Sequence, residues 1–270
     1  MIQLQAADAT VTIAPERGAR AVSWLVGEHE LLGGIGPGPR HNGFYPMAPW
    51  AGRIRDNNVP VDGGSVRMPA TLDGWAMHGL VLDRGWDVLE RTDRQARLQC
   101  RLGTPWPWTG SVTAGYHLSP GHLTVTLTVA TDADEFPATA GWHPWFRRTL
   151  TGSEPVRVEL PEAGLLPRGQ DHLPSSEAPV PPGPGPYDDC FHVPGRVATL
   201  TWAGALSLTC TSTAAWFVLF DEPAEAVCLE PQTHPPDALR TAELVSADLP
   251  LTLQTVWSWT TAETHPEEQP

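Results

Sequence analysis

The strongest constraint in this sequence is a period-two alternation of apolar and polar residues, which recurs along the chain. In residues 123–129 every second residue is Leu or Val, and the residues between them are threonines. Successive side chains of a strand point to opposite faces, so this pattern predicts a strand with one buried and one solvated face. Threonine and valine also suit the pleated surface of a sheet. No segment shows a convincing helical period.

Further strands are predicted in most of the chain. Residues 97–102, 199–202, 206–210 and 251–259 alternate, whereas 215–220 and 226–229 are continuous apolar runs suited to strands covered on both faces. The 25 glycines and 29 prolines can separate short strands with turns. We therefore expect an all-β fold, a large antiparallel sandwich, with residues 1–261 as a single domain. Residues 174–186, rich in Pro and Gly, should form a surface loop, and 262–270 a disordered acidic tail.

The charge and the basic residues limit the partners and the chemistry. A net charge of −14 argues against nucleic acid or an anionic membrane as partner and favours a neutral small molecule. All 17 basic residues are arginine, so a lysine Schiff base is excluded. The four cysteines show no CxxC pairing, and the N-terminus shows no signal-peptide pattern, so we expect reduced thiols and a cytoplasmic protein.

Several candidate site residues stand beside glycine, proline and tryptophan. His78 precedes Gly79 and lies near Trp75, and His143 follows Trp142 in a Gly-Trp-His-Pro segment. A single histidine of this kind is more often structural, but two in similar surroundings favour a site. Tryptophan faces pack against the apolar face of a pyranose, and histidine exchanges protons near neutral pH.

The remaining candidates are charged. Arg53 and Arg55 lie in a segment with Pro and Gly, where a guanidinium could be a plain surface charge or could bind adjacent hydroxyls. Asp188 begins an Asp-Asp pair that would ordinarily be a solvated turn. Glu230 ends an apolar run and precedes a proline, so it should be partly desolvated at a strand end, which suits a general base.

Taken in order, these segments resemble the aldose 1-epimerase family, the galactose mutarotases. The matching motifs are Arg53-Ile54, His78-Gly79, the Gly-x-His-Pro-aromatic-Phe of 141–146, the Asp-x-x-Phe of 188–191, and the Glu-Pro-Gln-Thr of 230–233 followed by Pro-Asp-Ala. The resemblance implies a supersandwich of antiparallel sheets and an enzyme that interconverts the anomers of a free aldose without a cofactor or a metal. The family usually has asparagine where this chain has Gly52.

The resemblance also implies a role for each matching residue. Glu230 corresponds to the general base, His143 to the general acid and His78 to a histidine near the reacting centre, with Arg53 and Asp188 as ligands of sugar hydroxyls. We add Trp142 and Trp75 as substrate-binding residues. Ring opening removes a proton from the anomeric hydroxyl and delivers one to the ring oxygen, so we expect the acid and the base on opposite sides of C1.

Three alternatives remain open at this point. The chain could be a non-catalytic carbohydrate-binding or regulatory protein on the same fold, because a fold does not fix a function. It could be an epimerase of a phosphorylated hexose, for which Arg147 and Arg148 are the candidate phosphate ligands. A metal-dependent hydrolase or lyase using His78, His143, His234 and Glu230 is a third alternative, although no close ligand pair supports it. The oligomeric state is open.

Overall fold

The computed structural model describes residues 1–176 and 178–261, and these residues are almost entirely β-structure. The predicted acidic tail, 262–270, lies outside the described residues. The only helices in the described part are three 3₁₀ turns, η1 (Pro15–Arg17), η2 (Arg55–Asn57) and η3 (Ala238–Arg240). None of its helices is long and apolar enough to cross a membrane.

The first of two large sheets has ten strands, and all pairings between them are antiparallel. In spatial order, with β4 (His29–Glu30) paired beside β3, they are β1 (Ile2–Ala6), β2 (Ala9–Ala14), β3 (Arg20–Val26), β5 (Phe44–Met47), β13 (Gly141–Arg147), β20 (Ala226–Gln232), β19 (Trp216–Phe220), β16 (Asp188–His192) and β15 (Gly164–Leu166).

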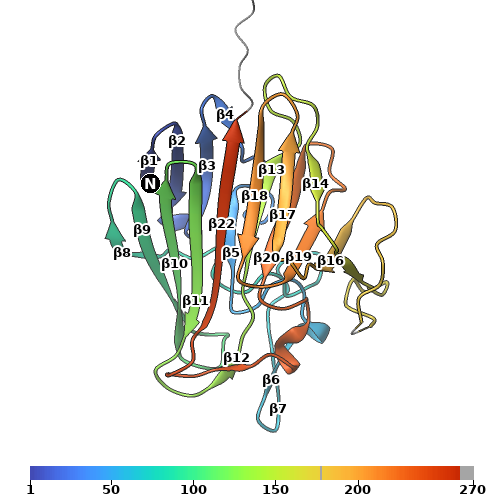
Figure 1. The fold of residues 1–270 in the computed structure, drawn as a ribbon. Coiled ribbons are helices and arrows are strands. Elements are labelled where there is room, and N and C mark those ends of the chain that lie inside the picture. Colours follow the sequence, from blue (N-terminus) through green and yellow to red (C-terminus); the bar gives the residue numbers. More distant parts are fainter. Residues whose placement is uncertain (177, 262–270) are drawn as a thin grey trace, which may run out of the picture.

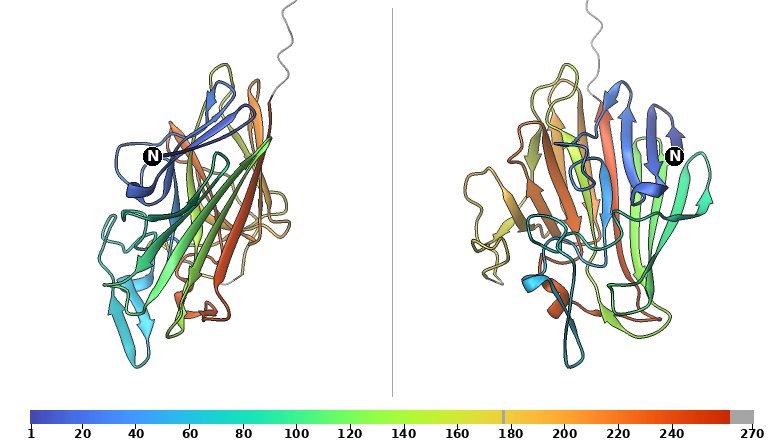
Figure 2. Two further views of the ribbon diagram at one scale, coloured as in Figure 1. Left: turned by 90° about the vertical axis from the view of Figure 1, so that its left-hand side faces the viewer. Right: turned by 180° about the vertical axis from the view of Figure 1, so that it is seen from behind.

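The second sheet has eight antiparallel strands and lies face to face with the first (Figures 1 and 2). Its order is β14 (Arg157–Glu159), β17 (Val197–Trp202), β18 (Leu206–Ser212), β22 (Leu251–Thr261), β11 (His122–Ala130), β10 (Gly110–Ser119), β9 (Gln95–Leu102) and β8 (Asp87–Arg91). Two small pairs, β6 (Asn58–Val61) with β7 (Gly64–Arg67) and β12 (Phe136–Pro137) with β21 (Leu244–Val245), lie beyond the large sheets. The predicted all-β class and the large antiparallel sheets are confirmed.

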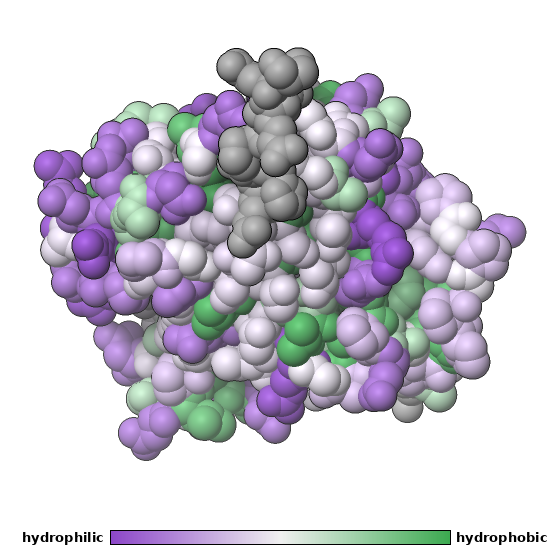
Figure 3. Space-filling model, turned by 45° about the horizontal axis from the view of Figure 1, so that its top comes forward, coloured by the Kyte–Doolittle hydropathy of each residue, from purple (hydrophilic) through white to green (hydrophobic). Residues whose placement is uncertain are grey.

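The core lies between the two sheets and follows the predicted alternation. In β11, Leu123, Val125, Leu127 and Val129 are fully buried, while the threonines between them are partly exposed on the outer face. Trp24, Trp142 and Trp257 are buried in the same core. The face shown in Figure 3 is mostly hydrophilic or neutral, as expected where the polar half of each strand faces water.

Both faces of the middle of the first sheet are covered. In β20 all seven residues are buried: Val227 and Leu229 join the core between the sheets, whereas Cys228 and Glu230 point to the outer face. The neighbouring strand β13 divides in the same way, with Trp142 and Phe146 in the core and His143 and Trp145 outside it. The alternation therefore collects side chains from several strands on one outer face.

The boundaries of β13 and β20 correct two sequence interpretations. The glycine and proline near His143 are typical of loops, and Glu230 was expected at a strand end; both residues lie inside strands. Pro144 and Pro231 carry no N–H, and the register between β13 and β20 has a gap between the pairs Gly141–Gln232 and Trp145–Cys228. Prolines therefore interrupt the ladder without ending the strands. Residues 178–186, in the predicted surface loop, are exposed, and Val180 forms a single bridge to Leu165.

Candidate active site

A pocket lies on the outer face of the first sheet, over β13, β20, β19 and β16. Its volume is about 250 Å³. Side chains on the strands form its floor, and the loops that contain residues 35–41, 52–53, 72–78 and 168–174 form its walls. The polar lining residues are Arg40, His41, Arg53, Asp73, His78, His143, Arg168, His172, Asp188, Asp189, Glu230 and Gln232. A concave site with convergent polar groups in an apolar frame is the usual form of a small-molecule site.

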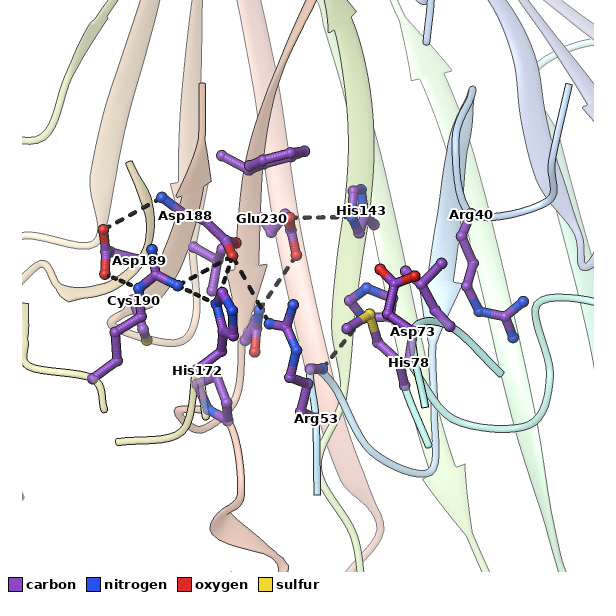
Figure 4. A pocket seen from close by; sticks show the side chains of 18 of the residues that line it. Arg40, Arg53, Asp73, His78, His143, His172, Asp188, Asp189, Cys190 and Glu230 are labelled. Atoms are coloured by element: carbon purple, nitrogen blue, oxygen red, sulfur yellow. Dashed lines mark hydrogen bonds and ion pairs between the residues drawn. The ribbon is translucent and has the colours of Figure 1, made fainter. Parts of the chain in front are cut away.

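His143 and Glu230 are in direct contact at the floor of this pocket (Figure 4). Nε2 of His143 lies 3.2 Å from Oε1 of Glu230, and the two residues are only 4% and 3% exposed. Their strands explain the contact, because these residues face each other in the gap that the prolines leave in the β13–β20 ladder. The expectation that they lie on opposite sides of C1 concerns a bound sugar; in the structure the two side chains contact each other directly.

Burial disfavours the charged form of both partners. It raises the pKa of Glu230 well above its usual range, with a smaller contribution from Asp188, while Arg53 acts in the opposite direction. It lowers the pKa of His143 well below its usual range, with a further contribution from the nearby His78. An ion pair between them would be favoured by the contact and disfavoured by desolvation. We infer that the pair carries one titratable proton in total, shared between the two side chains.

Aromatic rings fix the orientation of His143. Its ring stacks on Tyr45 of β5 at 4.6 Å and on Trp145 of its own strand at 5.3 Å, with interplanar angles of 24° and 19°. Tyr45 is fully buried, and its hydroxyl donates to the backbone carbonyl of Arg40 at 3.0 Å. The imidazole is thus held by packing, with its Nε2 edge toward Glu230.

His78 enters the pocket from a loop and is held by Gly52. The backbone N–H of Gly52 donates to Nδ1 of His78 at 3.3 Å, and the backbone N–H of His78 donates to the Gly52 carbonyl at 2.9 Å. Burial, with the charges of Arg40 and Arg53, lowers the pKa of His78 to about 3, so the ring is neutral and Nε2 carries its proton. His78 has a φ of +62°, a left-handed conformation that is uncommon outside glycine.

The Gly52 position, where the family usually has asparagine, is constrained by its surroundings. Its φ is +71°, and an added Cβ would lie 3.0 Å from Cβ of Pro236. Glycine therefore fits a left-handed backbone beside a proline. Asparagine also tolerates this conformation, but its side chain would have to displace the neighbouring ring.

The opposite wall of the pocket is a network of charges. Asp188 lies 3.9 Å from Arg53, and 3.5 Å from both Arg168 and His172, while Arg168 also donates from Nε to Asp189 at 2.7 Å. Burial raises the pKa of Asp188, although the two arginines and His172 act in the opposite direction. Figure 4 shows Asp188 and Asp189 on one side of the Glu230–His143 contact and His78, Asp73 and Arg40 on the other.

Most of the residues selected from the sequence meet in this pocket, but two tryptophans do not. Glu230, His143, His78, Arg53 and Asp188 line it, whereas Trp142 and Trp75 are absent from the lining. Trp142 precedes His143 in a strand, so its side chain points to the other face, where it is fully buried against Phe44 and Tyr116. Trp75 is half-buried in a tight turn with Leu72, whose side chain is the one that lines the pocket.

The lining residues that were not selected from the sequence include Trp145, Gln232 and Arg168. Trp145 and Gln232 lie two residues after His143 and Glu230, so a period of two could have identified them. Gln232 is fully buried, its Nε2 lies 3.5 Å from Oε2 of Glu230, and its Oε1 has no hydrogen-bond partner among the described residues. Arg168 lies in a loop between strands, and no sequence signal indicated it.

One group of possible metal ligands occurs among the described residues. Atoms of His143, Cys228 and Glu230 lie within 4.8 Å of one another, and all three side chains are buried. The histidine and the carboxyl already contact each other, and burial raises the pKa of the Cys228 thiol well above its usual range. Since a thiol must lose its proton to bind a metal, this chemistry suits acid–base work better than coordination. His234 does not line the pocket.

The chain is similar to known proteins in sequence and in fold. The family model of aldose 1-epimerase matches residues 1–243. A candidate aldose 1-epimerase from Escherichia coli K12 superposes with a TM-score of 0.80 at 17% identity, with 97% of this chain and 99% of that chain covered. A galactose mutarotase-like protein from Lactobacillus casei ATCC 334 gives 0.78 at 18% identity, with 96% and 100% covered.

An aldose epimerase homologue from C. elegans gives a TM-score of 0.79 at 13% identity, with 97% of this chain and 99% of that chain covered. At these identities the likeness shows the fold, and the expected galactose mutarotase-like sandwich is confirmed. No curated protein sequence matches the chain.

Proposed function

Because the chain belongs to the aldose 1-epimerase family, we propose that it interconverts the α and β anomers of a free aldose by acid–base ring opening. The observation that carries this proposal is the contact between His143 Nε2 and Glu230 Oε1, 3.2 Å long, at the buried floor of the pocket. We call these two residues the catalytic pair. Proton transfer by positioned side chains of this kind accelerates reactions by about 10² to 10⁴.

The direct contact suits the geometry of the reaction. The anomeric oxygen O1 and the ring oxygen O5 are both bonded to C1, so one proton must leave O1 and one must reach O5 at neighbouring positions. The catalytic pair presents an acceptor and a donor side by side on the pocket floor. The sugar then lies over the pair, with its O1–C1–O5 edge directed toward both residues.

The number of protons on Glu230 and His143 is the same at the start and at the end of the reaction cycle. In the ionised tautomer, Glu230 takes the proton of O1–H, His143 gives its Nε2 proton to O5, and the C1–O5 bond breaks to leave an aldehyde. Rotation about C1–C2 exposes the other carbonyl face. His143 then removes the proton from O5–H as it attacks C1, and Glu230 returns its proton to O1. The pair begins and ends with one proton, and no redox cofactor is required.

Without substrate, the uncharged tautomer of the pair, with Glu230 protonated and His143 neutral, is favoured over the ionised one. Burial raises the pKa of Glu230 and lowers that of His143, so the shared proton rests on Glu230 and moves to Nε2 of His143, 3.2 Å away, to give the ionised tautomer. Both tautomers contain the same number of protons. The balance between them is therefore independent of pH as long as the pair holds one titratable proton.

The walls supply the groups that hold the sugar. The neutral ring of His78 directs an Nε2–H donor toward the oxygen at C1, while Arg53 and Asp188 bind hydroxyls remote from it. The indole of Trp145 provides the apolar face that was assigned from the sequence to Trp142 and Trp75. Arg168 and Asp189 extend the polar wall beyond Asp188.

The charges of the pocket favour a free sugar over a phosphorylated one. Each arginine of the lining is already paired with a carboxylate: Arg40 with Asp83 at 3.0 Å, Arg53 with Asp188, and Arg168 with Asp188 and Asp189. A phosphate dianion would have to compete with these acids.

The arginines first considered for phosphate are also engaged elsewhere. Arg147 Nε donates to the Leu32 carbonyl at 3.0 Å, and Arg148 donates to the carbonyls of Asp221 and Pro223. Neither residue lines the pocket. We therefore propose an unphosphorylated aldose as substrate.

A mutarotation assay tests this proposal. Freshly dissolved α-glucose, α-galactose, xylose, arabinose and glucose 6-phosphate are followed by polarimetry or one-dimensional NMR, with and without protein, and binding is measured by calorimetry. We expect equilibration of at least one free aldose well above its spontaneous rate, and a weaker effect on the phosphate. The double variant Glu230→Gln/His143→Asn is the matched control. Binding without acceleration would instead identify a non-catalytic carbohydrate-binding protein.

A further inference from the structure

Arg20, the first residue of β3, carries a positive charge in the interior that the mechanism above does not use. The residue is 1% exposed, and no carboxylate of the described residues pairs with it. Burial lowers its pKa to about 10, so the guanidinium is still charged near neutral pH. Burial of a charge without an ionic partner costs much free energy, which the contacts of the guanidinium have to offset.

The guanidinium holds one wall of the pocket from behind. Its two terminal nitrogens donate to the backbone carbonyls of Pro39 and Asn42. The hydroxyl of Tyr45 donates to the carbonyl of Arg40, which lies between them. Three carbonyls of one short segment are therefore satisfied by Arg20 and Tyr45. This segment presents Arg40 and His41 to the pocket.

A glycine makes room for this arrangement. Gly43 has a φ of +74°, and an added Cβ there would lie 3.0 Å from both Cγ and Cδ of Arg20 and 2.7 Å from the carbonyl oxygen of Ala21. The stem of Arg20 passes where a side chain at position 43 would otherwise lie. The backbone beside the pocket wall is thus shaped to admit the arginine.

The ring of Tyr45 links this charge to the catalytic pair. Cζ of Arg20 lies 4.5 Å from the centroid of the Tyr45 ring, and that ring stacks on His143 at 4.6 Å. These two distances place the charge at most about 9 Å from the imidazole, through buried aromatic material with little screening. Arg20 therefore opposes a positive charge on His143.

Other groups around His143 come from several elements. The titratable or charged ones are Glu230 and Cys228 on β20, Tyr45 on β5, His78 and His41 on loops, and Arg20 on β3. Glu230 favours the protonated imidazole. His78 and Cys228 are held uncharged by burial, and Tyr45 likewise keeps its proton. Arg20 is the permanent positive charge in this set.

We propose that Arg20 is a positioning residue of the active site. The two terminal nitrogens of its guanidinium, the planar fork, hold the segment 39–42 by hydrogen bonds. Its charge keeps the shared proton of the catalytic pair on Glu230. The proposal rests on the proposed function for its kinetic part, and on the structure alone for the protonation of His143. Two substitutions separate the parts. Arg20→Met removes both the charge and the fork, whereas Arg20→Lys keeps the charge and loses the planar fork.

The first measurement follows the imidazole ¹⁵N shifts of His143 by NMR, without sugar, over the pH range in which the protein is folded. Removal of a like charge at about 9 Å should move protonation of His143 to higher pH by about one unit in Arg20→Met. Arg20→Lys should stay close to the parent. Arg17→Met, which removes an exposed arginine three residues away, is the matched control and should leave His143 unchanged.

The second measurement is steady-state mutarotation. Both Arg20 variants should raise KM several-fold, because Arg40 and His41 lose their support, and only Arg20→Met should move the acidic limb of the pH profile. A titration of His143 that moves no more in Arg20→Met than in Arg17→Met overturns the electrostatic part. An unchanged KM in both Arg20 variants overturns the positioning part.

Two further variants keep the test decisive. If Arg20→Met does not fold, Arg20→Gln supplies the neutral variant for NMR. Tyr45→Phe removes only the hydroxyl that binds the Arg40 carbonyl, so it should raise KM without moving the titration of His143. A protein that turns over no sugar at all would refute the proposed function, while the NMR comparison would still decide whether Arg20 controls His143.

Discussion

Replacement of Glu230 by glutamine is the sharpest perturbation of the catalytic pair. The side chains are nearly isosteric, so the amide can stay in contact with His143 Nε2, 3.2 Å from the present Oε1, and with Gln232. An amide oxygen cannot accept a proton from O1–H at useful pH. We expect kcat to fall by about 10² to 10⁴, or about 3 to 5.5 kcal/mol of barrier, while sugar binding persists.

The companion variant tests whether the two residues act as a unit. His143→Asn should lower kcat by a comparable factor, because the donor to O5 is lost. If one proton is shared by the pair, loss of either partner disables the same step. The double variant should then be only slightly slower than the worse single variant, and far from the product of the two effects.

Stability serves as the control for folding. The pKa of Glu230 is raised in the folded protein, so its contribution to stability is complete below the ordinary pKa of a glutamate and is lost as pH rises through the raised value. Glutamine does not ionise. Glu230→Gln should therefore unfold at a temperature no lower than the parent, with the difference in its favour growing toward alkaline pH.

The assay is polarimetry, or NMR exchange between anomers, on one sugar at one pH, with the spontaneous rate subtracted. Asp189→Asn is the matched acid-to-amide control, since Asp189 lines the pocket and bonds to Arg168 but not to the pair. Its kcat should stay within a few-fold of the parent. Parental kcat in Glu230→Gln would falsify the assignment of the base, and multiplicative losses in the double variant would refute the shared proton.

Further predictions follow from the same geometry. The kcat/KM profile should show a plateau where the pair holds one titratable proton: activity falls toward acid only below the usual histidine pKa, because burial lowers that value, and toward alkali only above the usual glutamate pKa, because burial raises that value. Arg53→Ala and Asp188→Ala should mainly raise KM, since hydroxyls remote from C1 change little in charge during ring opening; a loss of kcat with fixed KM would move Arg53 into the catalytic machinery. Gly52→Ala should cost about 1 to 2 kcal/mol of stability and also lower kcat through His78, whereas Gly63→Ala, with φ of +76° and open space around it, should show the backbone cost alone in thermal melts.

The alternation of apolar and polar residues predicted many of the strands of the fold. The strands predicted at 97–102, 199–202 and 251–259 lie within β9, β17 and β22, and the apolar run 226–229 lies within the doubly covered β20. Side-chain direction in a strand is a local property, so a period of two can be read without knowledge of neighbours. The motifs around His78, His143, Asp188 and Glu230 likewise indicated residues that meet in one pocket.

Strand pairing decided what the sequence left open. Trp142 and His143 are adjacent in the chain, yet the pleat sends one to the core and the other to the pocket, and only the continuation of β13 through Pro144 reveals this. The register of β13 against β20 also brings His143 and Glu230, 87 residues apart in the chain, to 3.2 Å.

The protonation of the pair was equally beyond the sequence. The pKa of a buried group depends on desolvation and on charges that arrive from other strands, as Arg20 does through Tyr45. The sequence by itself determined which residues could exchange protons and which faces their strands would bury. The tertiary structure decided which of those residues touch and how their charges balance, because both depend on the distances between segments far apart in the chain.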